Sequence, residues 1–495
     1  MEKKEYILTI DQGTTSTRAI IFDKYSNIIS SSQIEIEIIC PENGWVEQNP
    51  EEIYESVVTT IKNAIRKAKI NISDIKCIGI TNQRETTILW DKRTGKPVYN
   101  AIVWQSRQSQ SICEKWIEEG LTETIKNKTG LLINPYFSAS KIRWIFDNVE
   151  GVYEEALRGN ILFGTIDTYL VWKLTENRVH ITDYTNASRT MLFNIKKLKW
   201  DKDILNEFNI PSSILPQVHE SSEIYGEYEI NGVKIPIAAV VGDQQSSLFG
   251  QCCFNAGDVK NTYGTGCFML MNTKKEIIES DTGLLTTIAW GINGEVEYAL
   301  EGSVFVGGSA VQWLRDGMKM IEVSPDVESY SENGLESNGV YVVPAFVGLG
   351  TPYWDNDARG SVFGITRATK KEHFINATVQ SIAYQSKDVM EVMKEASKLE
   401  ICTLSVDGGA SVNNYLMQFQ SDILNCKIQR PKCLETTALG ATYLAGLAVG
   451  IFKNKEELLE LQIIDKIFIS TMKEEKRIKL YKGWKKAIEA TRIFK

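Results

Sequence analysis

The sequence predicts an α/β protein built from two similar lobes with a site between them. Strand-like and helix-like segments alternate along the chain, which is the pattern of layered α/β domains. A strand, a Gly/Thr turn and a second strand occur near the start of each half, at residues 6–23 and 258–271. The 495 residues allow two or three domains of ordinary size. The paired hairpins favour two domains and an internally duplicated architecture.

The first hairpin lies next to the N-terminus. Residues 6–10 form an apolar run that predicts a short buried strand, residues 11–17 are a polar turn, and residues 18–23 return as a second strand. P-loop and dinucleotide-binding sites need a strand, a glycine loop and then a helix. Here a strand follows the turn, and neither G-x-x-x-x-G-K-[ST] nor G-x-G-x-x-G occurs in the sequence. Both classes of site are therefore excluded.

Helix and strand signals alternate after this hairpin. Residues 51–69 carry apolar side chains at steps of three and four, which predicts an amphipathic helix. Residues 77–81 predict a buried strand, and residues 88–90 predict another. The polar segment 82–87 between them contains Arg84 and Glu85.

The second half repeats the hairpin. A hydrophobic strand at 235–241 ends in Gly242-Asp243-Gln244-Gln245, and a helix-like segment follows. Residues 258–271 then read as strand, Gly/Thr turn and strand. We place the domain boundary between them, which gives domains of 1–252 and 253–495.

The remaining segments complete the second half. Residues 401–406 predict a strand that leads into Asp407-Gly408-Gly409, and a helix is expected from about Asn413. Residues 437–446 read as a buried helix of small residues, and residues 474–486 as a solvated amphipathic helix.

Composition narrows the class of protein. The net charge of −8 and the pI near 5.4 give no basic footprint for nucleic acid. The nine cysteines form no C-x-x-C pair, which favours reduced thiols and a cytoplasmic location. No apolar run approaches the length of a membrane span, and the N-terminal residues do not resemble a signal peptide. We therefore expect a cytoplasmic enzyme or ATPase.

Asp11 and the turn after it are candidates for metal and phosphate binding. Glycine lets backbone N–H groups approach a phosphate, and the hydroxyls of Thr14, Thr15 and Ser16 add donors. A carboxylate at a strand end suits Mg²⁺, which prefers oxygen ligands and keeps several waters. A polar hairpin with internally bonded hydroxyls would explain the same residues. Thr265, between two glycines of the second hairpin, repeats the pattern and favours phosphate binding.

Three further groups have a structural and a functional interpretation. Asp243 could take a proton from a hydroxyl nucleophile, or cap a helix. Arg84 and Glu85 could bind vicinal hydroxyls, or form a surface ion pair. Aromatic residues could give a small polyol its apolar walls and a phenol, or belong to the core; these are Trp104, Tyr136 and Phe268.

Together these segments resemble the FGGY family of carbohydrate kinases, which have the two-lobed actin-like (ribonuclease H-like) ATPase fold. The resemblance covers nearly the whole chain, and it is closest to the members that phosphorylate glycerol. It is carried by the runs at 11–16, 79–87, 100–105, 182–190, 242–245, 260–268, 406–409 and 417–422, and by two longer stretches at 136–148 and 360–380.

The resemblance implies ATP-dependent phosphorylation of glycerol to glycerol 3-phosphate with Mg²⁺, in glycerol catabolism. Asp243 would be the general base. The expected glycerol-binding residues are Arg84, Glu85, Trp104, Tyr136, Asp243, Gln244 and Phe268. The expected ATP-binding residues are Thr14, Thr15, Ser16, Arg18, Thr265, Gly308, Gln312, Gly409 and Asn413. Asp11 and Asp243 would serve Mg²⁺, and a homodimer or homotetramer is expected.

Two regulatory features of such kinases are missing from the sequence. The region 230–235 lacks a Gly-Gly-Thr-Arg loop for fructose bisphosphate, and 225–230 contains no histidine that could be phosphorylated.

Three alternatives for the function stay open. One is a kinase for another polyol or ketose, such as dihydroxyacetone or xylulose. The others are an actin-like ATP-driven binding protein, which would need a further domain after Gly450, and a filament-forming relative of actin.

Overall fold

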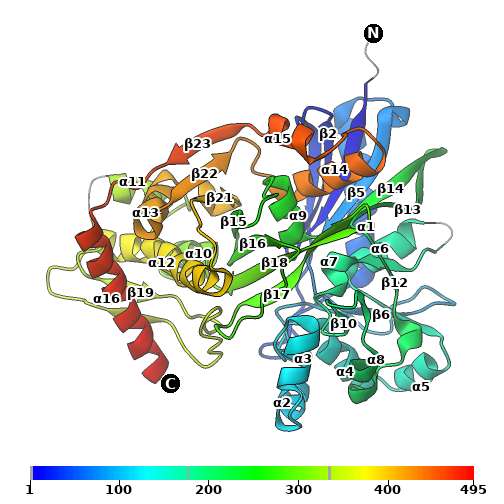
Figure 1. The fold of residues 1–495 in the computed structure, drawn as a ribbon, viewed down its shortest axis with the longest axis horizontal. Helices are drawn as coiled ribbons and strands as arrows, with labels where there is room; N and C mark the ends of the chain where they lie inside the picture. Colours follow the sequence, from blue (N-terminus) through cyan, green and yellow to red (C-terminus); the bar gives the residue numbers. More distant parts are fainter. Residues whose placement is uncertain (1–3, 176–177, 333–335, 495) are drawn as a thin grey trace.

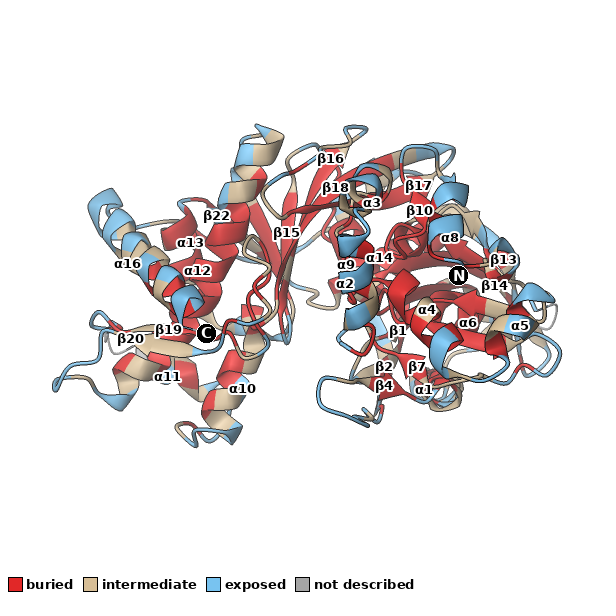
Figure 2. Cartoon of the chain, turned by 90° about the horizontal axis from the view of Figure 1, so that it is seen from below, coloured by how far each residue is buried: buried red, intermediate tan, exposed pale blue. Residues whose placement is uncertain are grey.

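The chain forms two lobes that lie side by side (Figure 1). The computed structural model describes residues 4–175, 178–332 and 336–494. Each lobe contains one large sheet, and buried residues follow the two sheets and the helices that cover them (Figure 2).

The first lobe is built on a six-stranded sheet with the order β13-β14-β5-β1-β2-β3. β1, β2 and β3 form an antiparallel meander, whereas β1, β5 and β14 run parallel. The strands are β1 (Tyr6–Gln12), β2 (Ser16–Asp23), β3 (Ile28–Glu35), β5 (Ile75–Asn82), β13 (Ser222–Ile230) and β14 (Val233–Gly242).

The second lobe is built on a seven-stranded sheet with the order β17-β18-β16-β15-β21-β22-β23. Its strands are β15 (Val259–Tyr263), β16 (Cys267–Lys274), β17 (Leu285–Ile292), β18 (Glu295–Val304), β21 (Thr403–Asp407), β22 (Lys427–Pro431) and β23 (Ile464–Phe468).

The two sheets share a similar arrangement of six strands, to which the second sheet adds the edge strand β17. β15, β16 and β18 are successive antiparallel neighbours, as β1, β2 and β3 are, although β17 lies between β16 and β18 in the chain. β21 and β22 run parallel to β15, as β5 and β14 run parallel to β1. The edge strands β13 and β23 are each antiparallel to their neighbour. The duplicated two-lobed α/β architecture predicted from the paired hairpins is confirmed.

Short strand pairs and helices fill the space around the sheets. The remaining strands are β4 (Glu47–Gln48), β6 (Ile88–Asp91), β7 (Ala101–Ile102), β8 (Ile161–Gly164), β9 (Ile181–Asp183), β10 (Phe193–Asn194), β11 (Lys199–Trp200), β12 (Gln217–His219), β19 (Tyr341–Val343) and β20 (Ser361–Phe363). The first-lobe helices are α1 (Pro50–Ala68), η1 (Ile72–Asp74), α2 (Gln110–Glu118), α3 (Thr122–Thr129), α4 (Ser138–Asn148), α5 (Val152–Leu157), α6 (Ile166–Leu174), α7 (Tyr184–Ala187), α8 (Lys202–Glu207) and η2 (Ser212–Ile214). The later helices are α9 (Asp243–Gly250), α10 (Gly308–Asp316), α11 (Asp326–Glu332), α12 (Lys371–Ser397), η3 (Gly409–Val412), α13 (Asn414–Leu424), α14 (Thr436–Ala448), α15 (Lys455–Leu461) and α16 (Glu474–Ile493).

Local sequence explains where α1 begins and ends. The Asn49 side chain accepts a hydrogen bond from the Glu51 N–H, and Pro50 occupies the first turn, where its missing N–H costs nothing. Lys69 ends the helix in the left-handed region, with φ of 53°. The apolar face that predicted this helix packs on β2 and β3.

α14 ties the C-terminal half of the chain to the first sheet. It packs on α9 and against β1, β5 and β14, where the Thr442 and Thr9 hydroxyls are 2.6 Å apart. The close approach depends on Gly440, since a Cβ there would lie 1.8 Å from the Ser246 carbonyl oxygen of α9. The predicted small-residue helix 437–446 therefore lies against the sheet of the first lobe (Figure 1).

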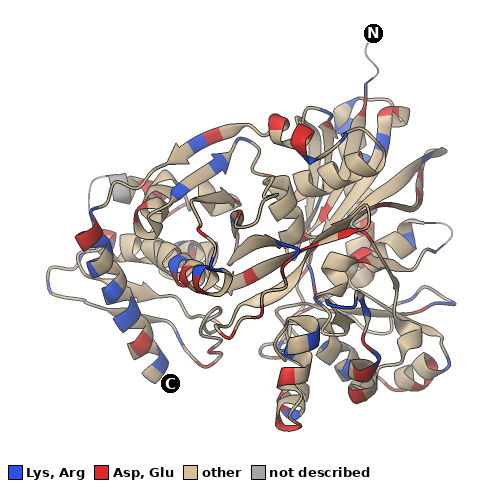
Figure 3. Cartoon of the chain, viewed as in Figure 1, with Lys and Arg blue, Asp and Glu red and all other residues tan. Residues whose placement is uncertain are grey.

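α16 has the predicted amphipathic character. Trp484, Ala487 and Ile488 are buried, while its charged residues form the outer face (Figure 2). Lys and Arg are interspersed with Asp and Glu over both lobes (Figure 3). Among the described helices, none combines the length and the apolar character that a membrane crossing requires.

Candidate active site

A cavity of about 440 Å³ lies where the two hairpin turns meet the ends of the parallel strands. The carboxyl ends of β1, β5 and β14 point to it, which is where open α/β sheets usually bind ligands. Its lining residues are Thr14, Thr15, Ile38, Arg84, Glu85, Trp104, Gln105, Tyr136, Asp243, Gln244, Thr265, Gly266, Phe268 and Gln312.

A second cavity of about 420 Å³ adjoins the first in the second lobe. Thr265 and Gln312 line both, so the two cavities meet at the turn of the second hairpin. Its other lining residues are Tyr263, Gly264, Gly308, Val311, Ser324, Pro325, Val327, Glu328, Val379, Gly409, Ala410, Val412, Asn413 and Leu416.

Most of the predicted site residues line one of these cavities. The first contains all seven predicted polyol-binding residues together with Thr14 and Thr15. The second contains Gly308, Gly409 and Asn413. Three predicted residues line neither cavity: Asp11, Ser16 and Arg18.

Arg84 and Glu85 are not a surface pair, because they are 3% and 1% exposed. Nε of Arg84 lies 3.2 Å from Oδ1 of Asp243 and 3.8 Å from Oε1 of Glu85. Burial raises the pKa of Glu85, and the Glu301 carboxylate adds a smaller increase. The guanidiniums of Arg84 and Arg189 lower this pKa, but they do not cancel the effect of burial. Glu85 also has φ of 59°, in the left-handed region that non-glycine residues rarely adopt. Such strain is found where the surroundings hold a functional group in place.

Aromatic side chains form one wall of the first cavity. The Trp104 ring centroid lies 5.5 Å from that of Tyr136 and 5.9 Å from that of Phe268, both edge to face. Trp104 Nε1 donates to the Thr14 hydroxyl at 2.9 Å, which fixes the indole against the first hairpin turn. These three rings face the cavity rather than forming only core contacts.

Asp243 is the first residue of α9, and the cap position is Gly242. Its Oδ1 accepts from the Gln244 N–H and its Oδ2 from the Gln244 side chain. The Asp243 side chain is 28% exposed, so the carboxylate reaches the cavity. The helix-capping interpretation of Asp243 therefore does not account for its position.

Asp11 lies near Asp243 at the end of β1. Burial raises the pKa of Asp11 to about 7; the guanidinium of Arg18 opposes this shift, and the carboxylates of Glu435 and Asp243 add to it. Among the described residues no group of three or more His, Cys, Asp and Glu could hold a metal ion. Two neighbouring carboxylates nevertheless fit Mg²⁺, which is usually held by one or two carboxylates, waters and substrate phosphates.

Arg18 lines neither cavity. Its guanidinium donates to Glu435 at 2.6 Å and to Gln33 at 3.0 Å, and its side chain is about one-third exposed. Arg18 thus links β2 to the start of α14 in this structure. Ser16 begins β2, with its carbonyl accepting from the Gly13 N–H.

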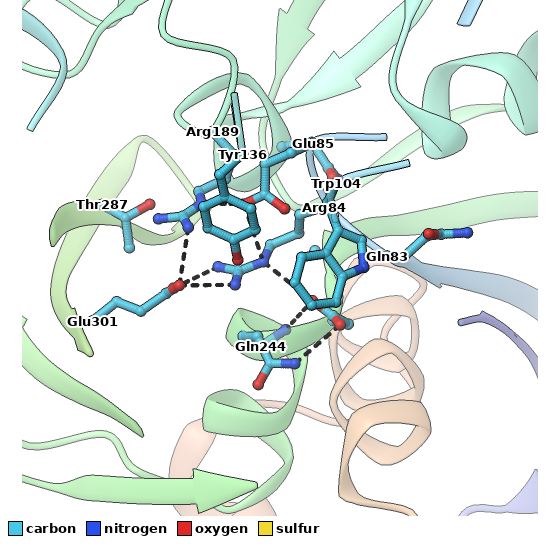
Figure 4. A network of polar contacts seen from close by, with 12 residues as sticks. Gln83, Arg84, Glu85, Trp104, Tyr136, Arg189, Gln244, Thr287 and Glu301 are labelled. Carbon is cyan, nitrogen blue, oxygen red and sulfur yellow. Dashed lines mark hydrogen bonds and ion pairs between the residues drawn. The ribbon is translucent and has the colours of Figure 1, made fainter. Parts of the chain in front are cut away.

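Four buried charged residues support the site and had no role assigned from the sequence. Lys260 donates to Gln244 Oε1 at 2.6 Å, and burial lowers its pKa to about 8 against the pull of nearby carboxylates. Lys141 donates to the Tyr136 and Phe137 carbonyls. Arg189 and Glu301 pair with Glu85 and Arg84 (Figure 4). Lys141, Arg189 and Lys260 belong to the runs that carry the family resemblance, whereas nothing local in the sequence marks Glu301.

Two α/β lobes whose sheets share a similar arrangement of six strands, with a cavity between their hairpin turns, define the actin-like ATPase fold. Family models match the N-terminal domain of the FGGY family of carbohydrate kinases at residues 6–250 and its C-terminal domain at 259–449. This chain belongs to the FGGY family of carbohydrate kinases.

Individual relatives are close. The chain is 58% identical to a glycerol kinase of Bacillus velezensis and 58% identical to one of Bacillus subtilis, each over 99% of both chains. A crystal structure of Plasmodium falciparum glycerol kinase with ADP is 38% identical, with a TM-score of 0.91 over 99% of this chain and 98% of that one. A xylulose kinase of Lactobacillus acidophilus has a TM-score of 0.86 at 22% identity, over 98% of this chain and 99% of that one, and shows the fold alone.

Proposed function

We propose that this protein transfers the γ-phosphoryl group of ATP to a terminal hydroxyl of glycerol, giving glycerol 3-phosphate. The observation that carries the proposal is the first cavity. It combines a buried arginine and two carboxylates with an aromatic wall, and it adjoins a second cavity at Thr265 and Gln312. The close relatives named glycerol kinase support the same substrate.

Asp243 is the general base in this proposal. As the terminal hydroxyl oxygen of glycerol attacks the γ-phosphorus, the Asp243 carboxylate accepts the hydroxyl proton and the bond to the β-phosphate oxygen breaks. The ion pair with Arg84 at 3.2 Å and the two bonds from Gln244 hold the carboxylate in one orientation. Phosphoryl transfer depends more on such positioning and charge neutralisation than on covalent help.

Arg84 and Glu85 bind the other hydroxyls, with the guanidinium donating and the carboxylate accepting. Trp104 and Phe268 pack against the carbon chain, and Tyr136 adds a phenol to the same wall. A substrate that lacks the vicinal diol would leave these buried groups unpaired, at a cost of about 1–3 kcal/mol each.

The second cavity holds the adenine nucleotide, and the two hairpin turns lie at its phosphates. Thr14, Thr15 and Thr265 line the cavities, and they supply hydroxyl and backbone donors there. Ser16 and Arg18 complete the phosphate site only if their side chains move, since Arg18 is bound to Glu435. Asp11 and Asp243 would hold Mg²⁺, which neutralises phosphate charge when bound.

We also propose the division into 1–252, for glycerol and phosphate binding, and 253–495, for adenine-nucleotide binding. The nine cysteines form no C-x-x-C pair, which supports a cytoplasmic location. A homodimer or homotetramer is proposed from the family resemblance, and light scattering of the purified protein distinguishes these states.

A coupled assay of ADP release tests the function. We expect ADP release that requires both glycerol and Mg²⁺, with glycerol phosphate as the product found by mass spectrometry. ADP release that is independent of glycerol, or a product of another mass, would contradict the proposal.

A further inference from the structure

A cluster of four buried charged side chains adjoins the first cavity, and two of its members line that cavity (Figure 4). Its members are Arg84, Glu85, Arg189 and Glu301, and each is at most 3% exposed. Two guanidiniums face two carboxylates, so the cluster is neutral as a whole. Unpaired buried charges are strongly unfavourable, so each member depends on the others.

Glu301 is the member that comes from the second lobe. It lies in β18, where it pairs in register with Leu270 of β16 and Leu285 of β17. The other three members follow β5 or α7 in the first lobe. The cluster therefore forms only when β18 lies against the first lobe as it does here.

Glu301 binds Arg84 through two parallel hydrogen bonds. Arg84 Nη1 donates to Glu301 Oε2 at 2.6 Å, and Arg84 Nη2 donates to Glu301 Oε1 at 2.9 Å. Nη1 also donates to Gln245 Oε1 at 3.1 Å. This two-point contact fixes the plane of the guanidinium. It leaves the Nε edge of Arg84 next to Asp243 and the cavity.

Glu301 also positions the second arginine. Arg189 Nη2 donates to Glu301 Oε1 at 2.9 Å, and Arg189 Nε donates to Glu85 Oε1 at 2.6 Å. The Arg189 guanidinium lies 5.6 Å from the Tyr136 ring centroid. Through Arg189, Glu301 thus supports Glu85 and the wall at Tyr136.

The charge state of Glu301 suits this role. Burial alone would raise its pKa, but the guanidiniums of Arg189 and Arg84 outweigh burial and lower the pKa to about 2. Glu301 is therefore ionised at neutral pH.

We propose that Glu301 of the second lobe is a positioning residue for the polyol, orienting Arg84 directly and Glu85 through Arg189 when the two lobes are docked. The inference rests on the proposed function. If it is correct, the second lobe contributes to substrate binding through a residue that does not line the cavity, in addition to those that do. Since Glu301 does not line the cavity, it acts through the arginines.

The test compares two substitutions of Glu301 with a matched control on the same strand. Glu301→Gln keeps the shape and removes the charge, and Glu301→Asp keeps the charge and shortens the reach. Glu297→Gln makes the same chemical change at another buried carboxylate of β18, which pairs with Lys274 and Lys455 and does not line the first cavity.

We expect Glu301→Gln to raise KM for glycerol at least tenfold with KM for ATP changed less than threefold. Glu301→Asp should give an intermediate KM for glycerol, and Glu297→Gln should leave both constants within twofold. A purely structural role would lower kcat in proportion to the folded fraction, with both KM values unchanged; that result overturns the proposal.

Glu301→Gln leaves two arginines against one glutamate, so it can fail to fold. In that case Glu301→Asp decides the question, because an unchanged KM for glycerol in that variant means that Glu301 acts on stability alone and contradicts the proposal. If the wild-type enzyme does not phosphorylate glycerol, the proposed function fails instead. The same variants are then compared on the polyol or sugar that the wild type does phosphorylate.

Discussion

Nε of Arg84 lies 3.2 Å from Oδ1 of Asp243, although the two residues follow different strands of the first sheet. Arg84 comes after β5, and Asp243 begins α9 after β14. Because these strands are neighbours and parallel, their carboxyl ends place the proposed polyol-binding arginine beside the proposed base.

Asp243→Asn should reduce kcat by about 10²- to 10⁴-fold, the usual contribution of a general base. The amide has nearly the same shape but cannot accept the hydroxyl proton. ATP affinity, measured by calorimetry without glycerol and without Mg²⁺, should change less than threefold. Asp316→Asn, on the surface of α10, is the control and should keep full activity. Near wild-type turnover in Asp243→Asn would rule out the base assignment.

Arg84→Lys should raise KM for glycerol much more than KM for ATP. Lysine keeps a positive charge beside Glu301 but cannot make the two parallel bonds or reach Asp243 in the same geometry. A lost buried hydrogen bond of about 1–3 kcal/mol corresponds to roughly a 5- to 150-fold rise in KM. Steady-state kinetics with each substrate varied give both constants. Arg93→Ala, an exposed arginine, is the control. Equal effects of Arg84→Lys on the two KM values would reject a specific role in binding the polyol.

Gly440→Ala should destabilise the protein by about 1–3 kcal/mol through overpacking. The added carbon would lie 1.8 Å from the Ser246 carbonyl oxygen, so α14 and α9 must move apart. Because α9 carries Asp243 at its first position, activity should fall as well. Urea unfolding measures the change. Gly409→Ala makes the same chemical change where nothing lies within 4 Å, and it should leave the free energy of unfolding unchanged. A Gly440→Ala variant as stable as the wild type would contradict the packing described for α14.

His180→Gln should make the protein less sensitive to acid. His180 Nε2 contacts the Phe163 carbonyl, and burial lowers the pKa of His180 to about 4 from its ordinary 6.5. The unfolded chain therefore takes up this proton first, and stability is lost as the pH falls from 6.5 towards 4, by up to about 3 kcal/mol. Urea unfolding at pH 7 and pH 4.5 should show a smaller loss for His180→Gln than for the wild type. An equal loss in both proteins would mean that His180 is not the cause.

Much of the fold could be predicted because its signals are local. The apolar runs and Gly/Thr turns marked both hairpins, and the periodicity of 51–69 marked α1, since strand and helix patterns repeat over a few residues. The position of α14 could not be predicted in this way. Its small residues indicated burial, but they did not show that the helix packs against the first sheet.

The residues of the candidate site also differ in whether the sequence could predict them. Arg84, Glu85 and Asp243 follow apolar strands, and strand ends are where a site is expected. Glu301 is separated from Arg84 by 217 residues and looks like any other glutamate in a strand. Its pairing depends on how the two lobes dock, which no local pattern encodes. For Arg18 the sequence implies a role that the structure does not display. The family resemblance implies that Arg18 binds phosphate, but its guanidinium is paired with Glu435, and this contact competes with that role.

The central claim is that the first cavity selects glycerol. The most direct measurement is kcat/KM for glycerol, dihydroxyacetone and xylulose with the same ATP and Mg²⁺ concentrations. The arrangement of Arg84, Glu85 and the aromatic wall predicts the highest kcat/KM for glycerol. A kcat/KM for xylulose tenfold above that for glycerol would contradict the account.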